Sequence, residues 1–211
     1  YRPFLVKEQK LLMMAQESNN SQQIIDTISK LVTTCTFEKI NATKSPVFDV
    51  EYLFLQIRGK SVGENVEIRV TCPDDKKTQV PVKLNLSDIS VQMTNDHSNV
   101  VNITDNIKMH LRYPLLSDIS ITENKSDTET VFELLNTCVH QLHYGDEIYH
   151  RSDISDKDMT EFIDQLTTGQ IETVMEFFNS MPKLRHVVSV TNPKTKKKSE
   201  VVLEGLQSLS E

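Results

Sequence analysis

The chain has 211 residues, which is long enough for one sizeable hydrophobic core or for two smaller cores that share an interface. Its formal net charge of −7 argues against a nucleic-acid-binding surface spread over the whole molecule, because affinity for phosphate comes from clustered Lys and Arg. Hydrophobic residues make up 37% of the chain, and no apolar run approaches the roughly 18 residues of a membrane-spanning helix.

Residues 1–63 predict an apolar arm followed by a layer of helices. Arg2-Pro3 favours extended backbone, and Phe4, Leu5 and Val6 form an apolar arm before a helix-compatible stretch at residues 7–15. Polar residues at 19–21 offer caps for a second helix. A third helix opens at Ser45-Pro46 and runs into the segment FDVEYLFLQIRGK. The chain begins at Tyr1 without a Met, so we expect further residues to precede it.

Residues 64–125 predict an antiparallel sheet with one face exposed to water. The spacing of apolar residues changes there to strict alternation, which is typical of half-buried strands. The segment Pro73–Lys77 has the composition of a turn and closes the first hairpin. The inward positions of the expected strands are Val66, Ile68, Val70, Cys72, Val80, Val82, Leu84, Leu86, Ile89, Val91, Met93, Ile107, Met109, Leu111 and Tyr113.

Residues 126–211 predict a helical region with a terminal β-hairpin. Three helices are expected, each opened by a Ser or Thr cap: 126 to about 143, 155 to about 166, and 168 to 180. The last segment, LRHVVSVTNPKTKKKSEVVLEGL, alternates like two strands around a turn. The whole chain is therefore predicted to be α+β, with its three regions packed as one compact unit.

Two segments of the chain resemble one another. VTCPDDKKTQVPV (Val70 to Val82) and VTNPKTKKKSEVV (Val190 to Val202) share Val, Thr, Pro, Lys, Lys and Val at an offset of 120 residues. Duplication of a hairpin and independent convergence on one turn chemistry both account for the similarity.

Charge is polarised along the carboxyl-terminal half. Residues 145–180 hold nine acidic and two basic residues, whereas residues 183–198 hold six basic and none acidic. Each set can be a solvated face, or the two can guide a docking partner electrostatically. Lys196, Lys197 and Lys198 fall at a hairpin tip, where they form either a solvated loop or a partner contact.

No motif in the chain carries recognisable catalytic or metal chemistry. The three cysteines are far apart and indicate reduced thiols rather than a disulfide framework. On the expected helix, Cys138 and His140 lie about 160° apart, and His140 with His143 lacks a third ligand. Cys72-Pro has no second cysteine at zinc-ribbon spacing. Phosphate loops, G-x-G-x-x-G and H-E-x-x-H are missing from the sequence, so we predict no enzyme activity, no metal and no cofactor.

Three segments together resemble the baseplate hub assembly proteins of T-even-like contractile-tailed bacteriophages. They are RPFLVKEQKLLMMA (Arg2 to Ala15), FDVEYLFLQIRGKSVGE (Phe48 to Glu64) and MPKLRHVVSVTNPKTKKKSEVVLEGLQS (Met181 to Ser208). They occur in the same order along almost the whole chain. Gln9 departs from the acidic residue expected there, and the tip around Asp74 and Asp75 is less similar.

The resemblance implies a structural or chaperone-like protein without catalytic residues. Such a protein acts in the host cytoplasm during assembly and helps hub and tape-measure-type components come together, with or without remaining in the virion tail baseplate. Its partners are other tail and baseplate hub proteins, and an oligomer is compatible with this role. From the residues themselves we expect partner contacts at Phe4, Leu5, Val6, Lys196, Lys197 and Lys198.

Two alternatives from other classes stay open. A tail-associated peptidoglycan hydrolase needs paired carboxylates in a cleft, whereas the acidic residues here fall on a helix face. A nucleic-acid-binding module that uses the lysine-rich hairpins predicts a steep dependence of DNA binding on salt.

Overall fold

The computed structural model describes residues 1–18, 20–119 and 126–206. The chain forms two compact units, one of residues 1–92 with 182–211 and the other of residues 93–181. Each unit contains its own hydrophobic core. The second unit is therefore inserted into the sequence of the first.

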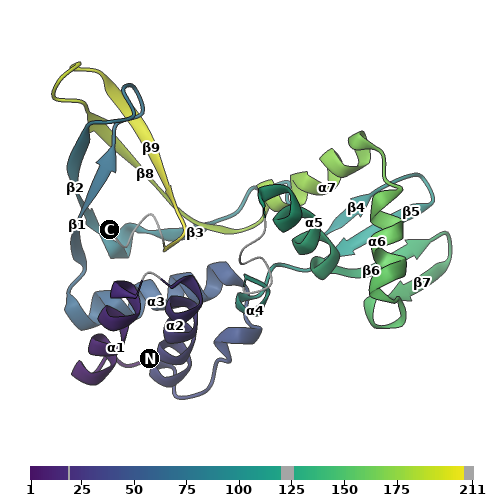
Figure 1. Ribbon diagram of the computed structural model, residues 1–211, viewed down its shortest axis with the longest axis horizontal. Coiled ribbons are helices and arrows are strands. Elements are labelled where there is room, and N and C mark those ends of the chain that lie inside the picture. Colours follow the sequence, from purple (N-terminus) through teal and green to yellow (C-terminus); the bar gives the residue numbers. More distant parts are fainter. Residues whose placement is uncertain (19, 120–125, 207–211) are drawn as a thin grey trace. The chain divides into compact units, whose positions relative to one another are not determined.

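The first unit begins with a layer of helices (Figure 1). Its helices are α1 (Val6–Glu17), α2 (Ser21–Cys35), the short 3-10 helix η1 (Ala42–Lys44) and α3 (Val47–Val62). Asn20 opens α2 as predicted, because its side-chain oxygen accepts a hydrogen bond of 3.0 Å from the Gln23 amide. Leu31 and Val32 of α2 and Val50 of α3 are buried, which fixes the two helices against each other.

Two β-hairpins complete the first unit and lie side by side in Figure 1. The first pairs β1 (Asn65–Thr71) with β2 (Gln79–Asn85), and the second pairs β8 (Lys183–Thr191) with β9 (Lys198–Glu204). After β2 follow the 3-10 helix η2 (Leu86–Asp88) and β3 (Ser90–Gln92), which adds to β8. One core joins the hairpins to α3, and its buried members are Leu55, Ile68, Val70, Leu84, Leu86, Ile89, Leu184, Val188, Val190 and Leu203.

The two hairpins bury equivalent positions. On the first strand of each hairpin the buried residues are Ile68 and Val70 in one and Val188 and Val190 in the other. These equivalent positions keep the offset of 120 residues. On the return strands the offset between equivalent residues is 119. Val80 pairs with Val70 in the first hairpin, and Ser199 pairs with Val190 in the second, so Val80 and Ser199 are equivalent. The second loop is therefore one residue shorter.

The end of β9 is held against the helical layer by one carboxylate. Glu51 of α3 accepts a hydrogen bond of 3.1 Å from the Leu206 amide. Gly205, at a φ of 70°, lies directly before it, and a Cβ there would come within 3.0 Å of Glu51 Oε1. Only glycine adopts this conformation freely and leaves room for the carboxylate.

The second unit is a four-stranded antiparallel sheet covered by helices on one face. The strands, in the order β4-β5-β6-β7, are β4 (Val100–Asn102), β5 (Ile107–Leu111), β6 (Val139–Tyr144) and β7 (Glu147–His150). The helices are α4 (Leu116–Ile119), α5 (Asp127–Cys138), η4 (Arg151–Asp153), α6 (Asp156–Asp164) and α7 (Thr168–Ser180). Leu135 of α5, Met159 of α6 and Val174 of α7 pack onto Met109 and Leu142 of the sheet.

The inserted unit leaves and rejoins the first unit at neighbouring positions. Gln92, the last residue of β3, pairs directly with Lys183 at the start of β8. Just inside the insertion, the Thr94 hydroxyl donates a hydrogen bond of 2.9 Å to the carbonyl of Ser180. Both ends of the insertion are thus tied close together, which is the usual arrangement where one domain is inserted into another.

The α+β class, the amino-terminal helices and the terminal hairpin are confirmed, but the helix predicted to reach His143 is wrong. α5 ends at Cys138, and β6 follows at once. Leu111 pairs with Val139 while His110 pairs with Gln141, so His140 is an extra residue in a β-bulge. The bulge spaces the inward Val139 and Leu142 three residues apart, which imitates a helical period.

Two smaller differences concern the sheet and one helix start. The strands expected in one sheet are divided among three sheets, because β3 pairs with β8 and β6 and β7 join β5. α7 is capped by Thr167, one residue before the predicted cap, and Gln170 completes its capping box. The domain boundaries expected from the sequence, 1–63, 64–125 and 126–211, stay a prediction.

Candidate functional site

The predicted amino-terminal arm is fastened to the helical layer, and only part of it is exposed. The Phe4 ring lies 5.8 Å from the Phe54 ring, and the Phe4 amide donates a hydrogen bond of 2.7 Å to the Ser61 hydroxyl. Leu5 is the amino-terminal cap of α1 and is 48% exposed, whereas Val6 is already helical and is 85% exposed. Phe4 thus packs into its own unit, and Leu5 and Val6 face water.

A buried ion pair fixes the start of α1. Arg2 Nη1 and Nη2 donate hydrogen bonds of 2.8 and 2.7 Å to the two carboxylate oxygens of Glu8. Glu8 also accepts a hydrogen bond of 2.7 Å from the Leu5 amide, and its side chain is buried. The hydrogen bonds from Arg2 lower the pKa of Glu8 to about 2. The carboxylate is therefore charged at neutral pH, and it stabilises the turn that presents Leu5 and Val6.

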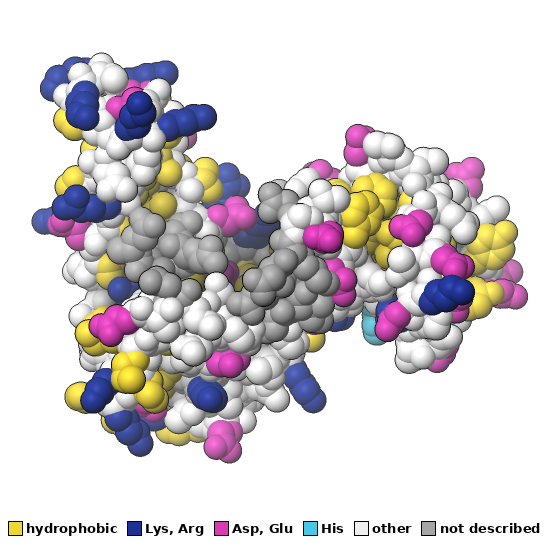
Figure 2. Space-filling view, in the orientation of Figure 1, with side chains coloured by type: hydrophobic (Ala, Val, Ile, Leu, Met, Phe, Trp, Pro, Cys, Tyr) yellow, Lys and Arg dark blue, Asp and Glu magenta, His cyan; other side chains and the backbone are white. Residues whose placement is uncertain are grey.

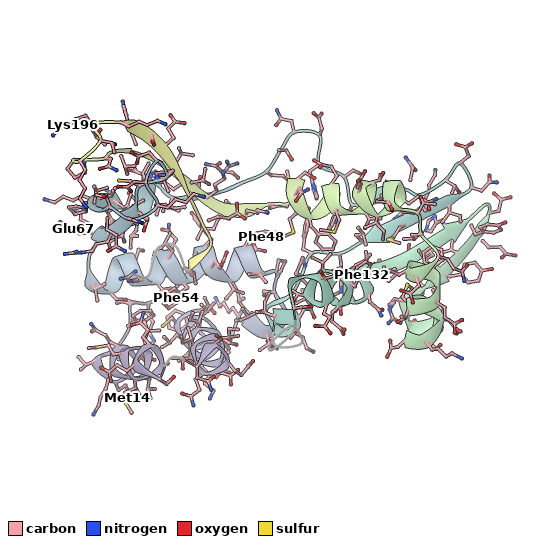
Figure 3. The ribbon with its side chains drawn as sticks, turned by 45° about the horizontal axis from the view of Figure 1, so that its top comes forward. Met14, Phe48, Phe54, Glu67, Phe132 and Lys196 are labelled. Atoms are coloured by element: carbon pink, nitrogen blue, oxygen red, sulfur yellow. The ribbon has the colours of Figure 1, made fainter. Side chains whose placement is uncertain are left out.

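An exposed apolar surface covers the outward side of α1. Leu12 and Ala15 are buried, whereas Met14 points away from the helical layer (Figure 3). We name the exposed apolar residues of this segment the amino-terminal apolar surface; its members are Leu5, Val6, Leu11, Met13 and Met14. Flexible Met side chains adapt to varied partner shapes, so a surface of this kind is typical of protein–protein contacts.

The predicted lysine contact lies at the tip of the second hairpin. Lys196 and Lys197 are in the loop, Lys198 is the first residue of β9, and all three are exposed. Figure 3 shows Lys196 at the tip and Met14 far from it on α1. The structure therefore places both sets of predicted contact residues in the first unit but does not bring them together.

The tips of the two hairpins are joined by a carboxylate. Asp74 of the first tip accepts hydrogen bonds of 3.0 and 3.1 Å from the side-chain amide of Asn192, and it accepts another from the Thr195 hydroxyl. These donors lower the pKa of Asp74 below its ordinary value. The lysines of the second tip thus lie beside Lys76 and Lys77 of the first.

The Cys138, His140 and His143 segment does not form a metal site. Cys138 is buried at the end of α5, and desolvation raises the pKa of its thiol to about 12. His143 lies on β6, where its ring stacks on His110 at 4.1 Å between centroids. Across residues 1–18, 20–119 and 126–206, no group of three His, Cys, Asp or Glu side chains could hold a metal ion.

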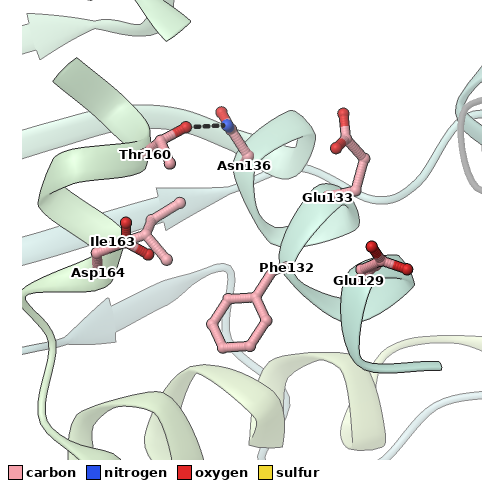
Figure 4. A pocket seen from close by; sticks show the side chains of 7 residues that line it. All are labelled: Glu129, Phe132, Glu133, Asn136, Thr160, Ile163 and Asp164. Atoms are coloured by element: carbon pink, nitrogen blue, oxygen red, sulfur yellow. Dashed lines mark hydrogen bonds between the residues drawn. The ribbon is translucent and has the colours of Figure 1, made fainter. Parts of the chain in front are cut away.

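A cavity of about 270 Å³ lies between α5 and α6 in the second unit (Figure 4). Its lining residues are Glu129, Phe132, Glu133, Asn136, Thr160, Ile163 and Asp164. Glu129 accepts hydrogen bonds from the backbone and hydroxyl of Ser126, which commits it to capping α5. The Asn136 side chain donates to the Thr160 hydroxyl at 3.2 Å and links the two helices. Glu129, Asn136 and Thr160 therefore make hydrogen bonds that stabilise the two helices.

The comparison with known families decides the class of protein. A sequence profile described as T4 bacteriophage base plate protein matches residues 1–209. The chain belongs to this family. No curated protein and no solved structure matches the chain.

Baseplate family membership agrees with a structural role and associates the protein with the virion tail baseplate. In the part of the chain that the structure describes, no helix is long and apolar enough to cross a membrane. The three cysteines of this baseplate protein are free thiols, and all are buried.

Sequence reasoning missed two parts of the candidate contact surfaces. The run Leu11-Leu12-Met13-Met14 has more consecutive apolar residues than one helix face can bury, and this excess was the available signal. The joining of the hairpin tips by Asp74 had no local signal, because its partners lie 118 and 121 residues away.

Proposed function

We propose that this baseplate protein is a non-enzymatic component or assembly chaperone of the baseplate hub, and that it binds hub and tape-measure-type proteins. The observation that carries the proposal is the amino-terminal apolar surface. The inner side of α1 is held by the buried Leu12 and Ala15 and by the Arg2–Glu8 ion pair. Its outer side exposes large apolar side chains to water. A partner that covers this surface would remove that apolar area from water.

Quantitative mass spectrometry tests where the protein acts. We expect the protein in purified virions or in baseplate intermediates isolated from the host cytoplasm. Presence in both identifies a resident component, and presence only in intermediates identifies an assembly chaperone. Absence from both would contradict the proposal.

The exposed lysines at the tips of the two hairpins make nucleic-acid binding a second candidate function. Lysine side chains bind phosphates as point charges, and such binding weakens steeply with salt. Fluorescence anisotropy with duplex and single-stranded DNA over a salt series measures it. A flat or undetectable response removes this candidate and leaves hub binding in place.

A further inference from the structure

The two hairpin tips form one basic surface, which we name the lysine tips. It combines residues from parts of the chain 120 residues apart, and Figure 2 shows the Lys and Arg side chains gathered there. All six lysines are exposed: Lys76, Lys77, Lys194, Lys196, Lys197 and Lys198.

The acidic residues of the tips are used for structure rather than for neutralising the lysines. Asp74 accepts hydrogen bonds from Asn192 and Thr195 and so holds the tips together. Asp75 accepts hydrogen bonds of 2.9 and 2.6 Å from the amide and hydroxyl of Thr78. Among the described residues, no ion pair joins any of the six lysines to a carboxylate. Like charges are thus gathered and kept available.

Both tips place a lysine where the backbone favours glycine. Lys76 has a φ of 53° and Lys196 a φ of 63°, and they occupy equivalent turn positions. The amide of Lys76 donates a hydrogen bond of 2.9 Å to the Cys72 carbonyl. The amide of Lys196 donates an equivalent hydrogen bond of 2.8 Å to the Asn192 carbonyl. The left-handed conformation costs a residue with a side chain about 1 kcal/mol. The two tips therefore share the same turn conformation and present a lysine at the same position of it.

The complementary charge is present in the same chain. Residues 93–181 hold 16 acidic and five basic residues, whereas the rest of the chain holds 14 acidic and 18 basic. The two units thus carry formal charges of −11 and +4. Within residues 145–180 all nine acidic side chains are exposed.

We propose that the lysine tips bind the acidic surface of residues 145–180 on a second copy of this chain, in a head-to-tail contact. Such a contact uses different surfaces on the two copies, and each copy carries one surface of each kind. This self-association is separate from the binding of other baseplate proteins through the amino-terminal apolar surface.

The chemistry of the tips favours a protein surface over a nucleic acid. Residues 72–78 and 192–198 contain no arginine for bidentate contacts to bases and no aromatic ring for stacking. An acidic protein surface requires neither group, because each lysine ammonium can pair with a carboxylate as a point charge.

Sedimentation velocity over a range of protein concentrations tests the contact. We expect self-association at about 50 mM salt that is lost at about 500 mM, because exposed charges are screened over a few ångströms at high salt. Reversing three tip lysines (Lys196→Glu, Lys197→Glu, Lys198→Glu) should weaken the association about tenfold or more. A control with the same net charge reverses exposed lysines away from the hairpins (Lys30→Glu, Lys39→Glu, Lys44→Glu) and should leave the association nearly unchanged.

A second variant separates loss of contact from loss of folding. Lys76→Gly with Lys196→Gly removes two charges and relieves the positive φ, so we expect weaker association with equal or higher melting temperature. The same result with a lower melting temperature would count against a direct contact.

A charge exchange identifies the partner surface. Asp164→Lys, Glu172→Lys and Glu176→Lys in one chain should abolish self-association, and an equimolar mixture with the Lys196–Lys198 reversal should restore it. A wild-type chain that stays monomeric at low salt, or a mixture that does not associate, overturns the proposal. Binding of the same tips to DNA without self-association overturns it in favour of nucleic acid. Neither result affects hub binding, which co-purification measures independently.

Discussion

Two charged or titratable side chains carry structural roles that single substitutions can test. Glu8 receives both guanidinium nitrogens of Arg2 and caps α1, so it combines an ion pair with a helix start. His110 packs against a second histidine on the open face of the second unit's sheet. In both cases the structure shifts the pKa, and the shift fixes how stability depends on pH.

Glu8→Ala should lower the free energy of unfolding by about 2 kcal/mol at neutral pH, because Arg2 loses the carboxylate that both of its terminal nitrogens contact and the Leu5 amide loses its side-chain acceptor. The pKa of Glu8 falls from 4.5 to about 2 on folding, so its contribution is present above pH 4.5 and is lost as the pH falls toward 2. Urea unfolding at pH 7 and pH 3 measures the loss, and exposed Glu17→Ala in the same helix is the control. Equal stability of the Glu8→Ala variant and the wild type at pH 7 would contradict this role.

The second unit should lose stability as the pH falls below 6.5. The pKa of His110 lies below its ordinary value of 6.5. Burial is the largest cause, and the nearby His143, His140 and Lys108 lower the pKa further. The unfolded chain therefore binds more protons, so the contribution of His110 is present above pH 6.5 and is lost as the pH falls through the folded value.

Hydrogen exchange of amides in β5 and β6 between pH 7.5 and 5 measures the effect, after correction for the intrinsic exchange rate. His110→Gln should flatten the profile, whereas His186→Gln in the first unit should not. A profile with the same slope in the His110→Gln variant would show that the histidine pair does not control stability.

At the scale of elements, helix starts were well predicted and long-range pairings were not. Caps at Asn20, Ser126 and Ser155 are local chemistry, because a side-chain oxygen bonds an amide three residues away. The strand β6 was missed because the bulge at His140 replaces alternation by a spacing of three. The pairing of β3 with β8 was missed because it joins residues about 90 positions apart, which no local period encodes.

Helix α1 has one buried side and one exposed apolar side, and the two sides should respond differently to charge. Met14→Glu, on the exposed side, should leave the melting temperature within a few degrees of wild type but should abolish binding of a hub partner. Leu12→Glu, on the buried side, should destabilise the first unit by several kcal/mol, because it buries a charge without a partner. Thermal unfolding and co-purification together separate the two effects. Loss of stability in the Met14→Glu variant would show that this side belongs to the core.

The whole molecule is built as one unit inserted into another, with opposite charge on the two. The sequence revealed the charge polarity, the amino-terminal helices and the terminal hairpin. It did not reveal the insertion, because the first unit closes only when β8 and β9 return to the core of β1, β2 and α3.

Removal of the insertion should leave the first unit folded. Gln92 and Lys183 are direct partners in antiparallel strands, so a two-residue Asn-Gly turn can replace the deleted residues 93–182. We expect cooperative thermal unfolding of the shortened chain and protected amides in β1, β2, β8 and β9. A shortened chain without protected amides would show that the core of residues 1–92 and 182–211 depends on the inserted unit.

We propose that this baseplate protein works by binding hub proteins rather than by catalysis. Co-expression with each baseplate hub and tape-measure protein, followed by size-exclusion chromatography with light scattering, tests it most directly. We expect the wild-type chain to co-elute with at least one of these proteins and the Met14→Glu variant to elute without it. A wild-type chain that elutes without any of them would contradict the claim.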